Sequence, residues 1–429
     1  MDGLLTIFVF IVFIIVITEI LNEKIFKISS NIALLIVSFG ISILFLIGNN
    51  IGIFNDDFFI FTGLNRIHLD KLLLEGALCF MIFAGASKFQ FSKFVSNFKQ
   101  ITLLSILTTV MSTVLYALIL YGISMLLNLN INIATCFLIG CIISPTDPIA
   151  ATGILSKLGM PKGISSVIEG ESLFNDGIGV ALFAFLENMI TNASRQDFLL
   201  LVGKNIFGAV IVGFTSSFIL FKLTKKTKNP NLHILISLLN VSLSYVLCEH
   251  FGFSGVISAV ICGFYFSYQN KKCERWKKVV DSKDLYTDFW NILDELLNKA
   301  LFVIIGLTAF IIPIHQSILI IIPIAIITNF VSRYISVLFT GIVLGKNSIP
   351  NKYSINGFAK LMTFCAMRGA VSLAMAFSAV GIISNDDYNT ILNFTLITIL
   401  FTTIIQGMLI PVVYKEVENV RKKKSLVKT

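Results

Sequence analysis

Charged residues are scarce in this chain. Only 13% of its 429 residues are Asp, Glu, Lys or Arg, whereas 56% are hydrophobic. A soluble globular domain has about 25% charged residues, so the composition excludes that class. Proline is also rare, with eight residues, and the alternation of polar and apolar residues that marks a membrane β-barrel is absent. The sequence therefore predicts an all-α, polytopic membrane protein.

The signals of several other protein classes are also missing. The seven cysteines show no metal-ligand spacing, and their odd number does not suggest a disulfide framework. No nucleotide-binding loop is present, which argues against a primary pump. The sequence indicates no cofactor and no enzymatic activity. The first apolar run, 4–21, lacks the basic segment and cleavage site of a signal peptide, so we expect a retained span.

Apolar stretches of about 20 residues, the length that crosses ~30 Å of hydrocarbon, predict thirteen spans. The predicted spans are 4–21, 30–48, 70–88, 101–127, 131–156, 165–190, 198–221, 232–249, 253–268, 286–312, 316–344, 356–382 and 388–414. The stretches 253–268 and 286–312 fit this pattern least well, because the first is short and the second begins with several polar residues. Residues 1–414 are thus predicted to form one membrane domain, followed by a short basic cytoplasmic tail, 415–429.

Lysine and arginine collect in alternate loops, as the positive-inside rule requires of a correct span count. The basic side includes clusters at 222–228, 271–283 and 421–428. The opposite side carries few basic residues and two acidic pairs, namely Arg66, Lys71, Arg195, Asp56–Asp57 and Asp386–Asp387. An odd span count then places the amino terminus outside and the carboxyl terminus in the cytoplasm, across the inner membrane. This distribution explains the net charge of +9 without a nucleic-acid partner.

Several charged residues fall near the centre of predicted spans. At ~1.5 Å per residue, Asp147 and Asp176 lie about 14 and 16 Å from the cytoplasmic ends of their spans, and Arg333 and Arg368 about 16 and 18 Å. Lys299 is central as well. A charge in a span costs at least ~2.5 kcal/mol, so it marks an ion or proton pathway by default. Acids and bases at one depth predict a midplane binding site, although depth does not give lateral distances.

One of these spans should be interrupted. In Ser144-Pro-Thr-Asp-Pro148, each proline removes a helical donor and restricts the residue before it. Non-helical backbone at membrane depth is tolerated where it lines a polar cavity, and the freed carbonyl of Thr146 is a hard oxygen ligand for a cation. The alternative is a kink covered by neighbouring helices, but an acid between two prolines favours a functional interruption.

In the next predicted span, 165–190, the polar residues lie on different faces of the helix. Ser172 and Asp176 are i,i+4 neighbours, whereas Glu171 lies about 140° round the helix from Asp176. Asp176 is therefore the candidate exchange site, and Glu171 is placed to pair with an arginine. Asn175 is an amide where a second carboxylate might stand. One cation for one proton is then the simplest expectation, although Asp147 could alter the count.

An aspartate can bind either a cation or a proton, and mutual exclusion at one site gives exchange. Oxygen-only ligands suit Na⁺ or Li⁺ and not the softer transition metals, for which the sequence shows no cluster of His or Cys. Three alternatives remain open: a K⁺/H⁺ antiporter, a cation channel without proton coupling, and a non-transporting membrane scaffold or sensor.

Three segments resemble the signature segments of the sodium/proton exchanger family, the first branch of the monovalent cation:proton antiporters. They are Gly170-Glu-Ser-Leu-Phe-Asn-Asp-Gly-Ile-Gly-Val180, Ser144-Pro-Thr-Asp-Pro-Ile-Ala150 and Met367-Arg-Gly-Ala-Val-Ser-Leu-Ala374. Supporting stretches at 301–307 and 83–86 occur in the expected order. The resemblance covers about residues 5 to 414.

The resemblance implies about thirteen helices in two inverted repeats, with interrupted helices at the midplane and a core domain that moves against a dimerisation domain. It also implies a homodimer and electroneutral exchange. The residues that it assigns to the ion or proton site are Asp176, Asn175, Asp147, Thr146 and Ser172. It pairs Glu171 with Arg368 and gives Arg333 a structural role.

Two residues depart from this pattern or complicate it. Many family members have a glutamate where this chain has Ala84. Glu75 is nine residues earlier on the same span, about 14 Å away, which is too far to replace it directly. Selectivity among Na⁺, Li⁺ and K⁺ therefore stays open. Lys299 is expected to form a structural pair with Asp294 or Glu295, and less readily to compete with cations or to pair with Asp147.

Overall fold

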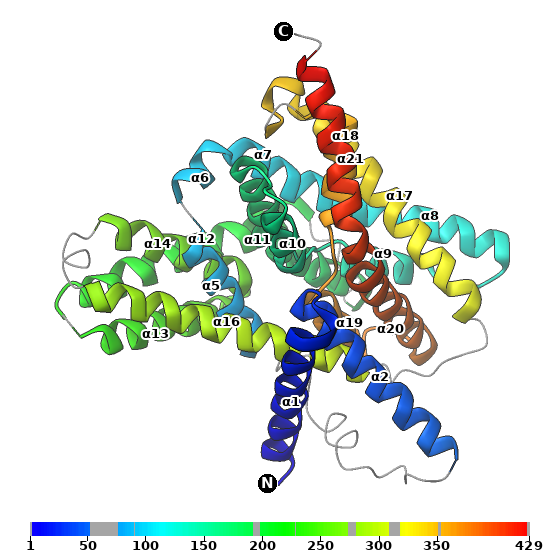
Figure 1. Ribbon diagram of the computed structural model, residues 1–429, viewed down its shortest axis with the longest axis horizontal. Coiled ribbons are helices and arrows are strands. Elements are labelled where there is room, and N and C mark those ends of the chain that lie inside the picture. Colours follow the sequence, from blue (N-terminus) through cyan, green and yellow to red (C-terminus); the bar gives the residue numbers. More distant parts are fainter. Residues whose placement is uncertain are drawn as a thin grey trace.

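The computed structural model describes residues 2–51, 76–89, 91–191, 198–227, 229–272, 280–308, 318–350 and 353–426. These residues are helical almost throughout, and the one pairing of extended backbone among them is an isolated bridge between Asp147 and Met367 (Figure 1). Eight helices within these ranges are long and apolar enough to cross a membrane. The predicted class, an all-α protein with many spans, is confirmed.

In chain order, the first elements are α1 (Asp2–Leu21), the π-helical turn η1 (Asn22–Phe26), α2 (Ser30–Asn50), α5 (Cys79–Lys88), α6 (Phe91–Ser96), α7 (Phe98–Leu103), the π-helical turn η3 (Leu104–Thr108), α8 (Thr109–Leu127), α9 (Ile133–Ile143), α10 (Ile149–Lys157) and α11 (Lys162–Thr191). The remaining elements are α12 (Phe198–Thr224), α13 (Pro230–His250), α14 (Gly255–Lys272), α16 (Val280–Thr308), α17 (Ile318–Leu344), the 3-10 turn η4 (Lys346–Ser348), α18 (Ile355–Cys365), α19 (Ala370–Ser378), α20 (Asn385–Leu400), the π-helical turn η6 (Phe401–Gln406) and α21 (Gly407–Leu426).

Each of the thirteen predicted stretches overlaps at least one of these helices. The exact number of spans stays a prediction, because five of the thirteen stretches contain none of the eight helices that meet the length and hydropathy of a span. These stretches are 70–88, 131–156, 253–268, 286–312 and 356–382. Some residues that entered the sequence analysis lie outside the described residues. They are Asp56, Asp57, Arg66, Lys71 and Arg195, which served to predict the orientation, and Glu75, which was considered as a cation ligand.

Helix α21 continues to Leu426, so the segment predicted as a tail from residue 415 begins as helix. Two of its acidic residues have partners earlier in the chain. Lys360 Nζ lies 2.6 Å from a Glu416 carboxylate oxygen, and the Tyr353 hydroxyl donates to Glu418 at 3.0 Å. These contacts extend the last helix beyond its apolar part.

Two helices of the fold are interrupted, and the interruptions meet. The predicted one separates α9 from α10 at residues 144–148. A second, which the sequence analysis did not place, separates α18 from α19 at residues 366–369. The backbone N–H of Asp147 donates to the Met367 carbonyl at 2.8 Å where the extended segments cross. Four half-helices thus point their ends at one place.

The turn η6 satisfies the backbone of the second interruption. Gln406 Nε2 donates to the carbonyls of Thr363 and Phe364, at 3.0 and 2.9 Å. The backbone N–H of Arg368 donates to the Thr402 hydroxyl at 3.1 Å. Because an unpaired backbone group in a low-dielectric interior costs several kcal/mol, on the order of a lost hydrogen bond or more, such partners are what permit extended backbone there. The widened turn therefore has a structural task.

Helix α11 lies directly against the first interruption. A Cβ built on Gly179 would lie 2.3 Å from Cγ of Pro145, which is closer than two carbon atoms can approach. Glycine at this position therefore lets the helix carry its polar residues up to the crossing, as small residues do between membrane helices.

We expect Gly179→Ala to destabilise the fold, because the new methyl group must displace Pro145, and overpacking of this kind costs about 1–3 kcal/mol. The measurement is the thermal unfolding temperature of the purified protein in detergent. Gly122→Ala in α8 is the matched control, since a Cβ there meets nothing within 4 Å. An equal unfolding temperature for both variants would contradict the close packing of α11 on Pro145.

Candidate functional site

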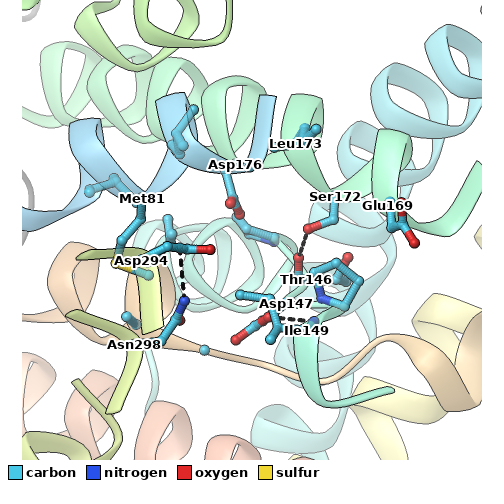
Figure 2. Close-up of a pocket in the computed structure, with 18 of the residues that line it drawn as sticks. Met81, Thr146, Asp147, Ile149, Glu169, Ser172, Leu173, Asp176, Asp294 and Asn298 are labelled. Carbon is cyan, nitrogen blue, oxygen red and sulfur yellow. Dashed lines mark hydrogen bonds between the residues drawn. The ribbon is translucent and has the colours of Figure 1, made fainter. Parts of the chain in front are cut away.

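A cavity of about 380 Å³ lies beside the crossing, between α5, α10, α11, α16 and α19. Four carboxylates line it, those of Asp147, Glu169, Asp176 and Asp294, and Figure 2 shows them on facing elements. Lys88 is the one basic residue among the lining residues. The cavity therefore carries more negative than positive groups and attracts cations.

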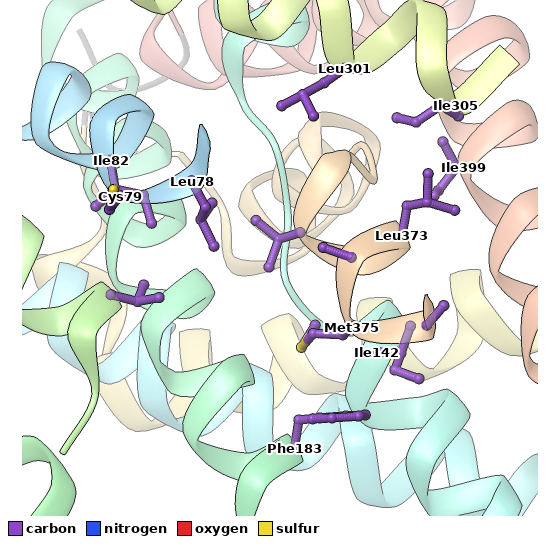
Figure 3. Packing of buried hydrophobic residues seen from close by; sticks show 14 of the residues in the cluster. Leu78, Cys79, Ile82, Ile142, Phe183, Leu301, Ile305, Leu373, Met375 and Ile399 are labelled. Atoms are coloured by element: carbon purple, nitrogen blue, oxygen red, sulfur yellow. The ribbon is translucent and has the colours of Figure 1, made fainter. Parts of the chain in front are cut away.

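Apolar side chains surround the crossing next to this cavity. Helix α19 packs against α9, α16 and α20. Figure 3 shows members of this buried cluster from these helices and from α5 and α11, namely Ile142, Leu301, Ile305, Leu373, Met375, Ile399, Leu78, Cys79, Ile82 and Phe183. This packing fixes the half-helices, so the polar groups at their ends have defined positions.

Asp176 lies on α11, one turn after Ser172, and both residues line the cavity. The two side chains thus lie on the same side of α11. Within the described residues, no hydrogen bond or ion pair reaches the Asp176 carboxylate, in contrast to the other acidic residue of this stretch, Glu171, which is paired. An unpartnered carboxylate in a cavity is free to take up a cation or a proton.

Asp147 occupies the start of α10. Its Oδ1 accepts the backbone N–H of Ile149 at 2.9 Å, so one carboxylate oxygen caps the half-helix. A Cβ on Gly369 would lie 2.8 Å from Oδ2 of Asp147. Only glycine fits at this point of the second interruption. Because Gly369 has no side chain, the Asp147 carboxylate has room at the cavity wall.

Two side chains of α11 fix Thr146. The Ser172 hydroxyl donates to the Thr146 carbonyl at 2.5 Å, and Asn175 Nδ2 donates to the Thr146 hydroxyl at 2.8 Å. Asn175 is fully buried and is not among the residues that line the cavity. In the structure Asn175 therefore orients the interrupted segment, while Ser172 and Thr146 face the cavity.

The predicted pair of Glu171 with Arg368 is wrong. Glu171 Oε1 lies 2.8 Å from Nη2 of Arg333, and both side chains are at most 2% exposed. Asn175 Nδ2 donates to the same Glu171 oxygen at 3.1 Å, and Arg333 Nη1 donates to the Thr108 hydroxyl at 3.1 Å. Depth alone placed the two arginines at about the same level, so it could not choose between them as partners of Glu171. Lateral position decides between them, and Glu171 faces α17 and η3.

Arg368 instead ties the two interruptions together. Its Nη1 donates to the carbonyls of Ser144 and Pro145, each at 3.0 Å, and its Nη2 donates to Asn329 Oδ1 at 2.9 Å. These carbonyls have lost their helical donors because the helix stops there. The signal for this contact was in the sequence, since two prolines leave carbonyls that need a buried donor.

Lys299 pairs with Glu295, four residues earlier, which is one of the two structural partners that the sequence analysis expected. Its Nζ lies 2.6 Å from Glu295 and 3.0 Å from Glu19, and it does not line the cavity. Neither Asp147 nor Asp294 is its partner. Asp294 lies instead 2.6 Å from Lys88 Nζ and lines the cavity, a position that the sequence analysis missed.

We expect Glu171→Gln and Arg333→Met each to lower the amount and the unfolding temperature of folded protein. Removing one partner of a buried ion pair costs about 3–5 kcal/mol, because the other charge stays buried without compensation. The double variant should recover much of that loss. In the matched cycle of Glu171→Gln with Arg368→Met, the losses should add. If stability recovered in the double variant with Arg368→Met and not in the one with Arg333→Met, the observed pairing would be contradicted.

Comparisons with known proteins identify the family of this chain. The family described as "Sodium/hydrogen exchanger, transmembrane" matches residues 10–416. The chain is 28% identical over 352 residues to the Na(+)/H(+) antiporter NhaP of Pseudomonas aeruginosa, which covers 80% of this chain and 81% of that protein. It is 30% identical over 289 residues to the Na(+)/H(+) antiporter NhaH of Halobacillus dabanensis, which covers 65% of this chain and 68% of that protein.

A solved structure has the same fold. The sodium proton antiporter MjNhaP1 from Methanocaldococcus jannaschii superposes with a TM-score of 0.74 at 20% sequence identity, over 97% of this chain and 99% of that one. Because the family match extends over nearly the whole length, this chain belongs to the sodium/hydrogen exchanger family.

Proposed function

We propose that this chain is a secondary transporter, not an enzyme, that exchanges a monovalent cation, Na⁺ in the first place, for H⁺ across a membrane. The observation that carries the proposal is the carboxylate of Asp176, which lines the cavity without a partner among the described residues. Relatives named Na⁺/H⁺ antiporters support the same activity.

The cation ligands that we propose are all oxygens of the cavity wall. They are the Asp176 carboxylate, the Ser172 hydroxyl and the Thr146 carbonyl, of which the last two already touch at 2.5 Å. Each of these oxygens keeps a lone pair for a hard cation. A proton on Asp176 removes the negative charge that holds the cation. Cation and proton therefore exclude each other at this carboxylate, and this competition alone couples the movement of one to that of the other.

One proton for one cation is the stoichiometry that this wall favours. Asn175 has no titrating group, and Asp147 already uses one oxygen on the Ile149 N–H. Glu171 is neutralised by Arg333 at 2.8 Å. A single exchanging carboxylate moves no net charge when a cation replaces a proton, so we propose electroneutral exchange.

We further propose that the chain works as a homodimer by alternating access, in which a core that contains the crossing moves against a dimerisation domain. Two interrupted helices that cross are the arrangement expected of inverted repeats with a central site. The amino and carboxyl ends lie at opposite ends of the molecule (Figure 1), which supports an external amino terminus and a cytoplasmic carboxyl terminus in the cell inner membrane.

We expect Asp176→Asn to abolish exchange, because the amide can neither release a proton nor neutralise a cation. The assay is dequenching of a pH-sensitive dye in proteoliposomes after Na⁺ addition. Glu187→Gln, an acid-to-amide change on the same helix but not at the cavity, is the matched control and should exchange normally. Cation flux that survives Asp176→Asn would favour a channel and contradict exchange at this residue.

Competition at one carboxylate also predicts how pH acts. Lowering the pH should raise the apparent KM for Na⁺, by up to about tenfold per pH unit, while the rate at saturating Na⁺ stays constant. Measured with Na⁺, Li⁺ and K⁺ at two pH values, the same series reports selectivity, including the K⁺/H⁺ alternative left open by Ala84. A KM that is independent of pH would exclude a shared site.

A further inference from the structure

The carboxylate of Asp294 lies on the wall of the cavity that α16 provides. It is 15% exposed, its Oδ2 lies 2.6 Å from Lys88 Nζ, and its Oδ1 accepts Asn298 Nδ2 at 3.1 Å. Asp294, Asn298 and Lys88 all line the same cavity as Asp147 and Asp176. This ion pair therefore forms part of the cavity wall.

The pair joins two helices that do not belong to the crossing. Lys88 is in the last turn of α5, and Asp294 is near the middle of α16, which packs against α5. Figure 2 shows Asp294 and Asn298 on one side of the cavity and Asp147 with Thr146 on the other. A cation between these walls feels both the carboxylate of Asp294 and the ammonium group beside it.

Lys88 is chemically a monovalent cation on a flexible tether. Its side chain is 36% exposed. Because exposed lysine–carboxylate pairs contribute little free energy, the ammonium group can leave its partner at low cost. A carboxylate that holds such a group can hold a free Na⁺ in its place. The two contacts are alternatives, because one unit positive charge compensates one carboxylate.

We propose that Lys88 is a tethered competitor for the cation at Asp294, so that this ion pair sets the affinity with which the cavity takes up its substrate cation. The inference rests on the proposed exchange function. Asp294 and Lys88 are specificity-determining residues in this account, and the exchange of cation for proton stays at Asp176.

The signs of the effects follow from charge. Without the Lys88 ammonium group, Asp294 is uncompensated and the cavity becomes more negative, so cations bind more readily. Without the Asp294 carboxylate, the ammonium group is unpaired and repels cations. Removal of both groups restores the original charge.

The test is the KM for Na⁺ in proteoliposomes, together with the maximal rate per folded transporter. Lys88→Gln should lower KM, and Asp294→Asn should raise it, each by roughly three- to tenfold, as one unit charge does at short range in a partly hydrated site. Lys88→Gln/Asp294→Asn should return KM to within about twofold of the wild type, and Lys88→Arg should keep it. The maximal rates should stay close to that of the wild type.

Lys360→Gln is the matched control. Lys360 forms the same kind of lysine–carboxylate pair with Glu416 at 2.6 Å and has a similar exposure of 37%, but it does not line the cavity. Its removal should leave KM unchanged.

Three results would overturn the inference. An unchanged KM in folded Lys88→Gln protein would leave the pair with a structural role alone, and this variant suffices even where Asp294→Asn does not fold. A shift of equal size in Lys360→Gln would show a general surface effect. Loss of all exchange in folded Asp294→Asn would make that residue obligatory. Absence of exchange in the wild type would instead refute the proposed function itself.

Discussion

Extended backbone in the interior of a membrane protein is the constraint on which the rest of this structure depends. Where α9 and α18 stop, N–H and C=O groups lose their helical partners, and lipid offers none. The protein supplies them from within. Asp147 and Met367 pair with each other, Arg368 donates to the carbonyls before the first break, and Gln406 donates to those at the second. The cavity exists because these groups are held apart from helical geometry without being left unpaired.

Helix α11 then divides its polar residues between two tasks. Glu171 is compensated by a buried arginine at 2.8 Å, so it cannot exchange its partner without a large cost. Asp176, five residues later, faces the cavity and has no such partner among the described residues. Asn175 lies between them and contacts both Glu171 and Thr146. One helix thus carries a paired carboxylate and an unpaired one, and it also holds the Thr146 carbonyl through Ser172.

The sequence was sufficient wherever the cause was local. Two prolines three residues apart predicted the break at 144–148, and helical spacing separated Asp176 from Glu171. It was insufficient wherever the structure depends on contacts between helices that are distant in the sequence. The second break has no proline. It depends on Arg368 and on the π-helical turn η6, whose residue Thr403 contacts Arg368 from 35 residues later in the chain. Depth could not choose between Arg333 and Arg368. Lys88 and Asp294 meet across 206 residues, and no periodicity reports such a contact.

Charge compensation differs among the three aspartates of the cavity, and this order has a physical consequence. Asp294 has a full counter-charge in Lys88, and Asp147 has the partial charge of one backbone N–H at a helix start. Asp176 has neither within the part of the chain that the structure describes. A helix N-terminus carries only about half a unit of positive charge. The local potential therefore becomes more negative from the α16 wall toward α11. A cation that enters the cavity is drawn toward Asp176, the one of these three aspartates that has no counter-charge among the described residues, and a proton on Asp176 removes that attraction.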